Sequence, residues 1–137
     1  MEIKIGDKFS TTREITDELI RAFADLSGDH NPIHLDEEFA AKTRFGRRIA
    51  HGMLSGAFIS AVLGGTRTPS SAIAPRIVYL SQTMKFIAPV FIGDCVTTTA
   101  TVVRIREDKG IVLLETICTN QNGEPTLKGE AAVMILP

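Results

Sequence analysis

The stretch IAHGMLSGAFISAVLGGT, residues 49–66, decides the fold, because it carries no formal charge unless His51 is protonated. Its length approaches that of a membrane span. It also contains two serines and four glycines, and basic residues flank it on both sides. That density of small and polar residues is unfavourable in contact with lipid. We therefore expect no membrane partner, and a helix over 49–63 that is buried all round inside a soluble protein.

Small residues recur at every fourth position of this helix and therefore share one face. They are Gly52, Gly56, Ser60 and Gly64. Side chains this small allow a sheet to approach the helix closely. The neighbouring face carries Ser55, Ile59 and Leu63, which either line a cavity or belong to the core.

The segments on either side of this helix differ in kind. Upstream, the patterns predict a short strand over 3–9, a helix that begins after Thr16 and ends at Gly28, and a short helix over 36–42. Downstream, runs rich in Val, Ile and Thr predict strands over 77–87, 95–106, 111–119 and 126–136. Helices followed by antiparallel strands indicate an α+β fold in which a sheet covers one long helix.

The composition fits one globular domain over residues 1–137, with 44% hydrophobic and 23% charged residues. Fifteen Lys and Arg stand against sixteen Asp and Glu, a balance that gives no indication of a nucleic-acid partner. The two cysteines, Cys95 and Cys118, lie in strand-like runs without the spacing of a metal site. We therefore expect reduced core thiols and a cytoplasmic protein.

The run GDHNPIH, residues 28–34, places a carboxylate and an imidazole five residues apart across a turn. A rigid turn that holds Asp29 and His34 together suits proton-transfer chemistry. The alternative is an Asx turn next to a partly buried, hydrogen-bonded histidine.

Three residues of the same run are expected to support the turn. Gly28 can adopt the left-handed conformation that ends a helix. Asn31 is disfavoured in the helical region by the proline that follows it, and Pro32 fixes its own φ. The run therefore predicts a stiff connection between two elements.

Gly52 stands at the start of the long helix, where the first N–H groups have no partner within the helix and lie at the positive end of its dipole. A glycine there lets a ligand oxygen approach the amide, as in an oxyanion hole. The alternative is that Gly52 serves close packing alone.

A metal site is not expected. His30 and His34 have the i,i+4 spacing of a zinc-binding helix, but Asn31 and Pro32 interrupt such a helix. The glutamate of that motif is absent, and no cysteine supports the set. We expect His30 to point to solvent.

Three blocks resemble the MaoC-like family, which includes (R)-specific enoyl-CoA hydratases (hydratase 2) and related 3-hydroxyacyl dehydratases. FADLSGDHNPIH, residues 23–34, with Ala40 after it, is similar to the hydratase-2 motif and is the most specific block. IAHGM, residues 49–53, looks like the start of the family's central helix, and KFIAPVFIGD, residues 85–94, looks like the strand and turn that follow. The resemblance covers nearly the whole chain and implies a hot-dog fold, an antiparallel sheet wrapped around a long central helix.

The resemblance also implies a hydro-lyase that reversibly hydrates trans-2-enoyl-CoA to (R)-3-hydroxyacyl-CoA without a cofactor. Asp29 and His34 would hold one water above C3, with Asp29 as the base, and the Gly52 amide would bind the thioester oxygen. The acyl chain would follow Ser55, Ile59 and Leu63. The enzyme would be a homodimer with its active sites near the subunit interface.

Positive charge is needed for the phosphates of CoA. The candidates are Lys85, Arg47, Arg48 and Arg76, each alternatively an ordinary solvated residue. Within the same fold, a 3-hydroxyacyl-carrier-protein dehydratase is the nearest rival, and Arg44, Arg47 and Arg48 keep a carrier-protein partner open. A rival from another class is a non-catalytic acyl-binding module, which intact Asp29 and His34 disfavour.

Overall fold

The computed structural model describes residues 3–65 and 76–137, which form one layer of helices against one curved sheet. In chain order the elements are β1 (Lys8–Glu14), α1 (Asp17–Ser27), α2 (Pro32–Leu35), α3 (Glu37–Ala41), α4 (Gly52–Gly64), β2 (Ile77–Phe86), β3 (Cys95–Arg106), β4 (Ile111–Thr119) and β5 (Pro125–Ile135). No helix in this part of the chain is both long and apolar enough to cross a bilayer.

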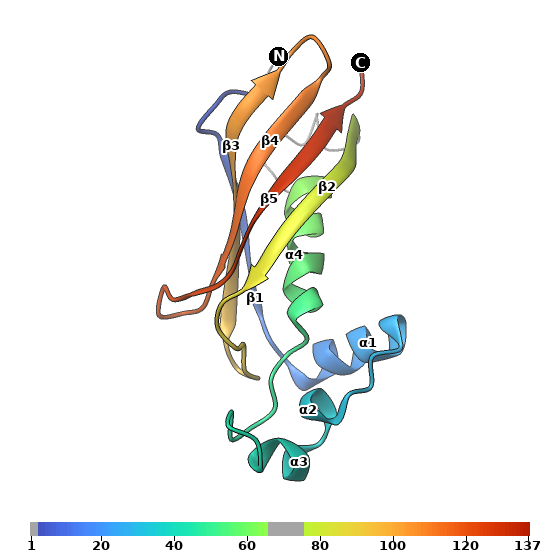
Figure 1. Ribbon diagram of the computed structural model, residues 1–137, viewed down its shortest axis with the longest axis vertical. Helices are drawn as coiled ribbons and strands as arrows, with labels where there is room; N and C mark the ends of the chain where they lie inside the picture. Colours follow the sequence, from blue (N-terminus) through green and yellow to red (C-terminus); the bar gives the residue numbers. More distant parts are fainter. Residues whose placement is uncertain (1–2, 66–75) are drawn as a thin grey trace.

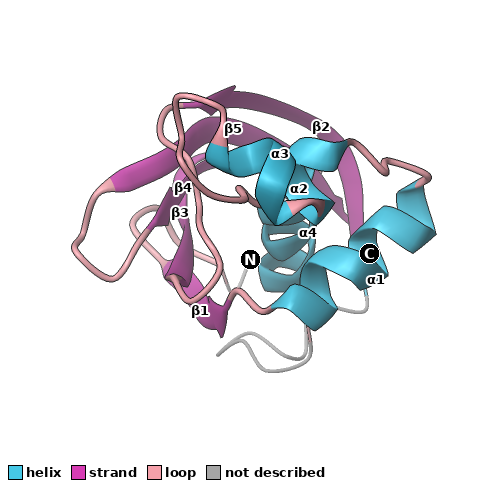
Figure 2. Ribbon diagram, turned by 90° about the horizontal axis from the view of Figure 1, so that it is seen from below, coloured by secondary structure: helices cyan, strands magenta, loops and turns pink. Residues whose placement is uncertain are grey.

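The five strands form one antiparallel sheet in the order β1-β3-β4-β5-β2. The sheet curves around α4, and the three shorter helices gather beyond the N-terminal end of α4 (Figures 1 and 2). This is the expected α+β arrangement, with four of its strands close to their predicted bounds. It leaves β1 and β2 as the two edges of the described sheet.

The prediction for the first strand, residues 3–9, is wrong, because the strand spans Lys8–Glu14. A turn occupies the predicted segment: the Asp7 N–H donates to the Lys4 carbonyl, and Gly6 has a φ of 94°. The pairing of β1 with β3 begins after this turn, with Lys8 opposite Thr101.

The central helix begins at Gly52, three residues later than predicted. Ile49 bridges to Phe91, and the Ala50 N–H donates to the Val90 carbonyl at 2.7 Å, so this segment is still extended. The Gly52 N-terminus therefore sits directly after a segment anchored to the neighbouring loop.

The expectation that α4 is buried all round is wrong for a single chain. One face is buried in the core, with Ile59 fully inaccessible, whereas Met53, Ser60 and Gly64 on the other side are exposed. The small-residue stripe approaches the sheet closely at its first two positions. A Cβ on Gly52 would lie 2.8 Å from the Phe86 ring, but one on Gly64 would meet nothing within 4 Å.

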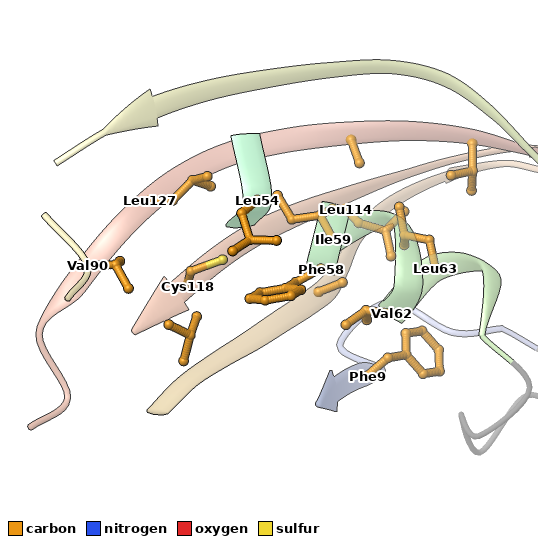
Figure 3. Packing of buried hydrophobic residues seen from close by; sticks show 14 of the residues in the cluster. Phe9, Leu54, Phe58, Ile59, Val62, Leu63, Val90, Leu114, Cys118 and Leu127 are labelled. Atoms are coloured by element: carbon orange, nitrogen blue, oxygen red, sulfur yellow. The ribbon is translucent and has the colours of Figure 1, made fainter. Parts of the chain in front are cut away.

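The core lies between the buried face of α4 and the concave face of the sheet (Figure 3). The helix contributes Leu54, Phe58, Ile59, Val62 and Leu63, and β4 and β5 contribute residues that include Leu114, Cys118 and Leu127. Burying an aliphatic side chain of this size contributes about 1.5–3 kcal/mol. This packing fixes the position of α4, and with it the N-terminus at Gly52.

Candidate active site

The predicted turn is present and begins at the end of α1. Gly28 has a φ of 84° and donates its N–H to the Ala24 carbonyl at 2.8 Å, which ends the helix as expected. The Asp29 N–H then donates to Ser27 Oγ at 3.1 Å, and Asp29 Oδ1 accepts from the Asn31 N–H at 3.2 Å. Asp29 is thus held through its main-chain N–H by Ser27 and through its carboxylate by Asn31.

Asn31 and Pro32 start a helix, where the sequence predicted only a stiff turn. The Asn31 side chain accepts the Ile33 N–H at 3.1 Å and caps α2, and Pro32 occupies the first helical position. Proline is favoured there because its missing N–H would have no partner. The short helix carries His34 inward, toward the start of α4.

His34 is buried, and its two nitrogens have different partners. Nδ1 lies 2.7 Å from the Ile49 carbonyl oxygen, which can only accept, so Nδ1 carries the proton. Nε2 is then bare and lies 4.0 Å from Asp29 Oδ2. Burial lowers the pKa of His34 below its ordinary value and favours the neutral form.

Arg48 is buried and bonds to the main chain of His34. The two predictions made for it from the sequence, a contact with the CoA phosphates and an ordinary solvated residue, are both wrong. Its side chain is 6% exposed; Nε donates to the His34 carbonyl at 2.6 Å and Nη2 to Asp17 at 2.6 Å. Glu37 lies 3.5 Å from Nη1. The hydrogen bond from Arg48 holds the pKa of Asp17 below its ordinary value. This one side chain therefore joins α1, α2 and α3 around the site.

His51 also lies in the site, although no role was predicted for it from the sequence. Its ring stacks on His34 with centroids 3.9 Å apart, and Nε2 lies 3.0 Å from the Asp29 carbonyl oxygen. The sequence signal was present, since an imidazole inside an otherwise apolar segment needs a partner when it is buried.

Gly52 is the first residue of α4, and its N–H has no acceptor among residues 3–65 and 76–137. Such a group at the positive end of a helix attracts an oxygen that carries negative charge. A Cβ at this position would also contact the Phe86 ring too closely. The two roles expected for Gly52 from the sequence, binding a ligand oxygen and close packing, are therefore compatible.

One cavity of about 390 Å³ brings these groups together. Its lining includes Asp29, His34, Gly52 and Ser55, with Phe86 and Leu127 from the sheet side. Ile59 and Leu63, expected beside Ser55, do not line it. Ile59 is fully buried in the core, and Leu63 lines a separate cavity of about 10 Å³.

The basic candidates are divided between the cavity and the surface. Arg44 lines the cavity and its guanidinium lies 4.9 Å from the Phe45 ring, whereas Arg47 is exposed over the Phe91 ring at 3.9 Å. Lys85 and Arg76 are exposed. Positive charge is therefore available at the cavity from Arg44.

Asp29, His34 and His51 form a cluster whose ligand atoms lie within 4.8 Å of one another, close enough to surround a metal ion. One nitrogen of each histidine donates a hydrogen bond to a carbonyl oxygen, and the remaining nitrogen of His51, Nδ1, is buried. Two free ligand atoms remain, fewer than the three or four that protein zinc sites use. His30 is exposed and pairs with Asp25 at 3.2 Å, which agrees with its expected position.

The fold and the site define a class: a hot-dog protein with a carboxylate–imidazole pair and a free helix N-terminus at one cavity. The chain belongs to the MaoC-like family, whose MaoC like domain model matches residues 2–121. It is 47% identical to an (R)-specific enoyl-CoA hydratase of Rhodospirillum rubrum over 98% of this chain and 89% of that one.

Two further comparisons bear on fold and substrate. The structure of the (R)-hydratase from A. caviae involved in PHA biosynthesis superposes with a TM-score of 0.91, at 38% identity, over 98% of each chain. A mitochondrial 3-hydroxyacyl-[acyl-carrier-protein] dehydratase of Arabidopsis thaliana is 36% identical over 98% of this chain and 78% of that one.

Proposed function

We propose that this chain is an (R)-specific enoyl-CoA hydratase, a hydro-lyase that reversibly converts trans-2-enoyl-CoA to (R)-3-hydroxyacyl-CoA. One observation carries the proposal: the gap between Asp29 Oδ2 and His34 Nε2 is 4.0 Å and opens into the same cavity as the start of α4. Both atoms are acceptors, so a single water can donate one hydrogen to each.

In the hydration direction, the water oxygen attacks C3 while Asp29 takes one of its protons. The π electrons move toward the thioester oxygen, where negative charge develops. The N–H of Gly52, at the positive end of α4, stabilises that charge. The enolate then collapses and C2 takes a proton from the Asp29–His34 pair, which restores the pair. The reaction balances without a cofactor, since the thioester itself activates C3.

The acyl group occupies the cavity beside Ser55, and a longer tail extends along the same buried face of α4 toward Leu63. Ser55 lines the large cavity and Leu63 the small one, farther along the helix. We infer that Arg44, which lines the cavity, meets the phosphates of CoA.

Truncating Leu63 tests this path. Leu63→Ala enlarges the small cavity, so the ratio of the activity with trans-2-dodecenoyl-CoA to the activity with crotonyl-CoA should rise by several-fold. Val102→Ala is the control, because Val102 is also buried but lies on β3 and lines neither cavity. An unchanged ratio in Leu63→Ala would place Leu63 in the core alone.

We also infer that the protein is a homodimer that pairs through β2 and α4. β2 is an edge strand with exposed Val78, Tyr79 and Leu80, and Met53 on α4 is 52% exposed. Of these residues, Met53, Tyr79 and Leu80 line a groove between the helix and the strand. Exposed apolar strand edges of this kind are usually covered by a partner.

The activity is tested by following the loss of the enoyl-thioester absorbance with crotonyl-CoA, combined with chiral analysis of the product. The expected result is rapid loss and the (R)-alcohol. Formation of the (S)-alcohol, or no loss of absorbance, would contradict the proposal.

Carrier-protein thioesters are the second substrate to assay. The Arabidopsis relative and the basic residues Arg44 and Arg47 favour this alternative. A kcat/KM that is higher with crotonyl-carrier protein than with crotonyl-CoA would move the assignment to a 3-hydroxyacyl-carrier-protein dehydratase.

A further inference from the structure

A second imidazole lies directly behind the Asp29–His34 pair. His51 is 3% exposed, and its ring is enclosed by His34 on one face and by the edge of Phe23, with ring centroids 4.9 Å apart. The mechanism above does not use this residue. A histidine buried so completely at the site requires a role in packing, in hydrogen bonding, or in both.

The hydrogen bonds of His51 fix its tautomer. Nε2 lies 3.0 Å from the Asp29 carbonyl oxygen, which can only accept, so Nε2 carries the proton. Nδ1 is buried and has no hydrogen-bond partner within the described residues.

The side chain of His51 is not used to cap α4, although His51 occupies the N-cap position. N-cap side chains ordinarily accept a hydrogen bond from the second or third N–H of the helix. Here the side chain points to Asp29 instead. The contact spans 22 residues of sequence, and it ties the turn that carries Asp29 to the residue immediately before Gly52.

We propose that His51 is a positioning residue, which holds the main chain of Asp29 through Nε2–H and the plane of His34 through ring stacking, and so sets both at a fixed distance from the Gly52 amide. The inference rests on the proposed hydratase function. His51 acts through Asp29 and His34 and does not react with substrate.

Positioning is expected to affect kcat more than KM. A misplacement of about 1 Å between reacting groups can cost about a hundredfold in rate. The side chain of Asp29 is half exposed and lies in a short connection between helices, so its position depends on such anchors. Loss of His51 should therefore slow turnover while leaving the binding of the thioester largely intact.

Three variants separate the hydrogen bond from the ring. His51→Gln keeps an N–H that reaches the Asp29 carbonyl, His51→Phe keeps a ring without a donor, and His51→Ala keeps neither. With crotonyl-CoA we expect kcat to fall about 10–100-fold in His51→Ala and His51→Phe, with KM within about threefold, and to recover to within about fivefold of wild type in His51→Gln.

His30→Gln is the matched control, because His30 is exposed and its ring pairs with Asp25; its kcat should not change. Thermal melts confirm that each variant is folded at the assay temperature. A His51→Phe variant as active as His51→Gln, or a His51→Ala variant within about threefold of wild type, would overturn the proposal.

A measurement on the wild-type protein keeps the test independent of variant folding and of activity. The chain contains three histidines, so the ring nitrogens can be assigned by NMR with His30→Gln as a reference. The expected signature is a protonated Nε2 and a bare Nδ1 on His51 at the pH of the assay. A proton on Nδ1 with a bare Nε2 would overturn the proposal even if the protein is an active hydratase. An inactive wild type with the expected tautomer would instead count against the hydratase function.

Discussion

At the scale of single residues, the site depends on a carboxylate that can accept a proton from water. Asp29 Oδ1 is occupied by the Asn31 N–H, which leaves Oδ2 toward His34. Asp29→Asn replaces the acceptor oxygens by an amide and should reduce kcat by about 10²–10⁴-fold, the usual value of a positioned acid or base. Crotonyl-CoA kinetics measure this, with the exposed Asp25→Asn as control. Retention of more than about a tenth of the wild-type rate would remove Asp29 from its role as the base.

The protonation state of His34 should make the activity depend on pH. The neutral form has a bare Nε2, and burial lowers its pKa from the ordinary value of 6.5. Neutral His34 therefore persists below pH 6.5. Its contribution to the stability of the folded protein is present above pH 6.5 and is lost as the pH falls through the lowered pKa. In a kcat/KM profile against pH, the midpoint of the acid limb should lie below pH 6.5. A midpoint above that value would show that protonated His34 is not what limits activity.

At the scale of elements, the short helices around the site are joined by charge more than by apolar packing. Arg48→Ala removes a buried guanidinium that bonds the His34 carbonyl and Asp17. Its two carboxylate partners, Asp17 and Glu37, stay largely solvated without it. The free energy of unfolding should therefore fall by about 1–3 kcal/mol, comparable with leaving one buried acceptor unsatisfied. Urea unfolding measures this, and the exposed Arg47→Ala should change stability by less than about 0.5 kcal/mol. A larger loss from Arg47→Ala would reverse the roles of the two arginines.

Arg48 also illustrates where prediction from sequence ends. Local patterns predicted the left-handed Gly28, the Thr16 cap and most strands, because each depends on a few neighbouring residues. The contact between Arg48 and Asp17 spans 31 residues, and no local pattern encodes it.

The start of β1 and the start of α4 were misplaced for a related reason. Each boundary is set by a hydrogen bond to a distant segment, as between the Ala50 N–H and the Val90 carbonyl. The candidate pair Asp29 and His34 was identifiable because the two residues lie only five positions apart in the sequence. The stacked His51 required the tertiary structure.

At the scale of the whole molecule, the unpartnered faces adjoin the site. Met53 lines both the 390 Å³ cavity and the groove between α4 and β2. A second copy that covers β2 would therefore border the active site. That residues 1–137 form a single domain stays a prediction, which the dimer hypothesis assumes.

The dimer hypothesis predicts a mass in solution twice the 14.9 kDa of one chain. Leu80→Lys places a charge on the exposed β2 edge and should shift the protein toward monomer, because a desolvated lysine in an apolar interface is unfavourable. Val103→Lys is the matched control: Val103 is 43% exposed against 46% for Leu80, and each lies at a register shift, but Val103 is on the interior strand β3. Light scattering measures the mass, and crotonyl-CoA turnover at the same concentrations measures the site. We expect Leu80→Lys to lose the dimer and the turnover together, since Met53 lines both the groove and the cavity. A monomeric wild type, or Val103→Lys dissociating as readily as Leu80→Lys, would move the interface away from β2.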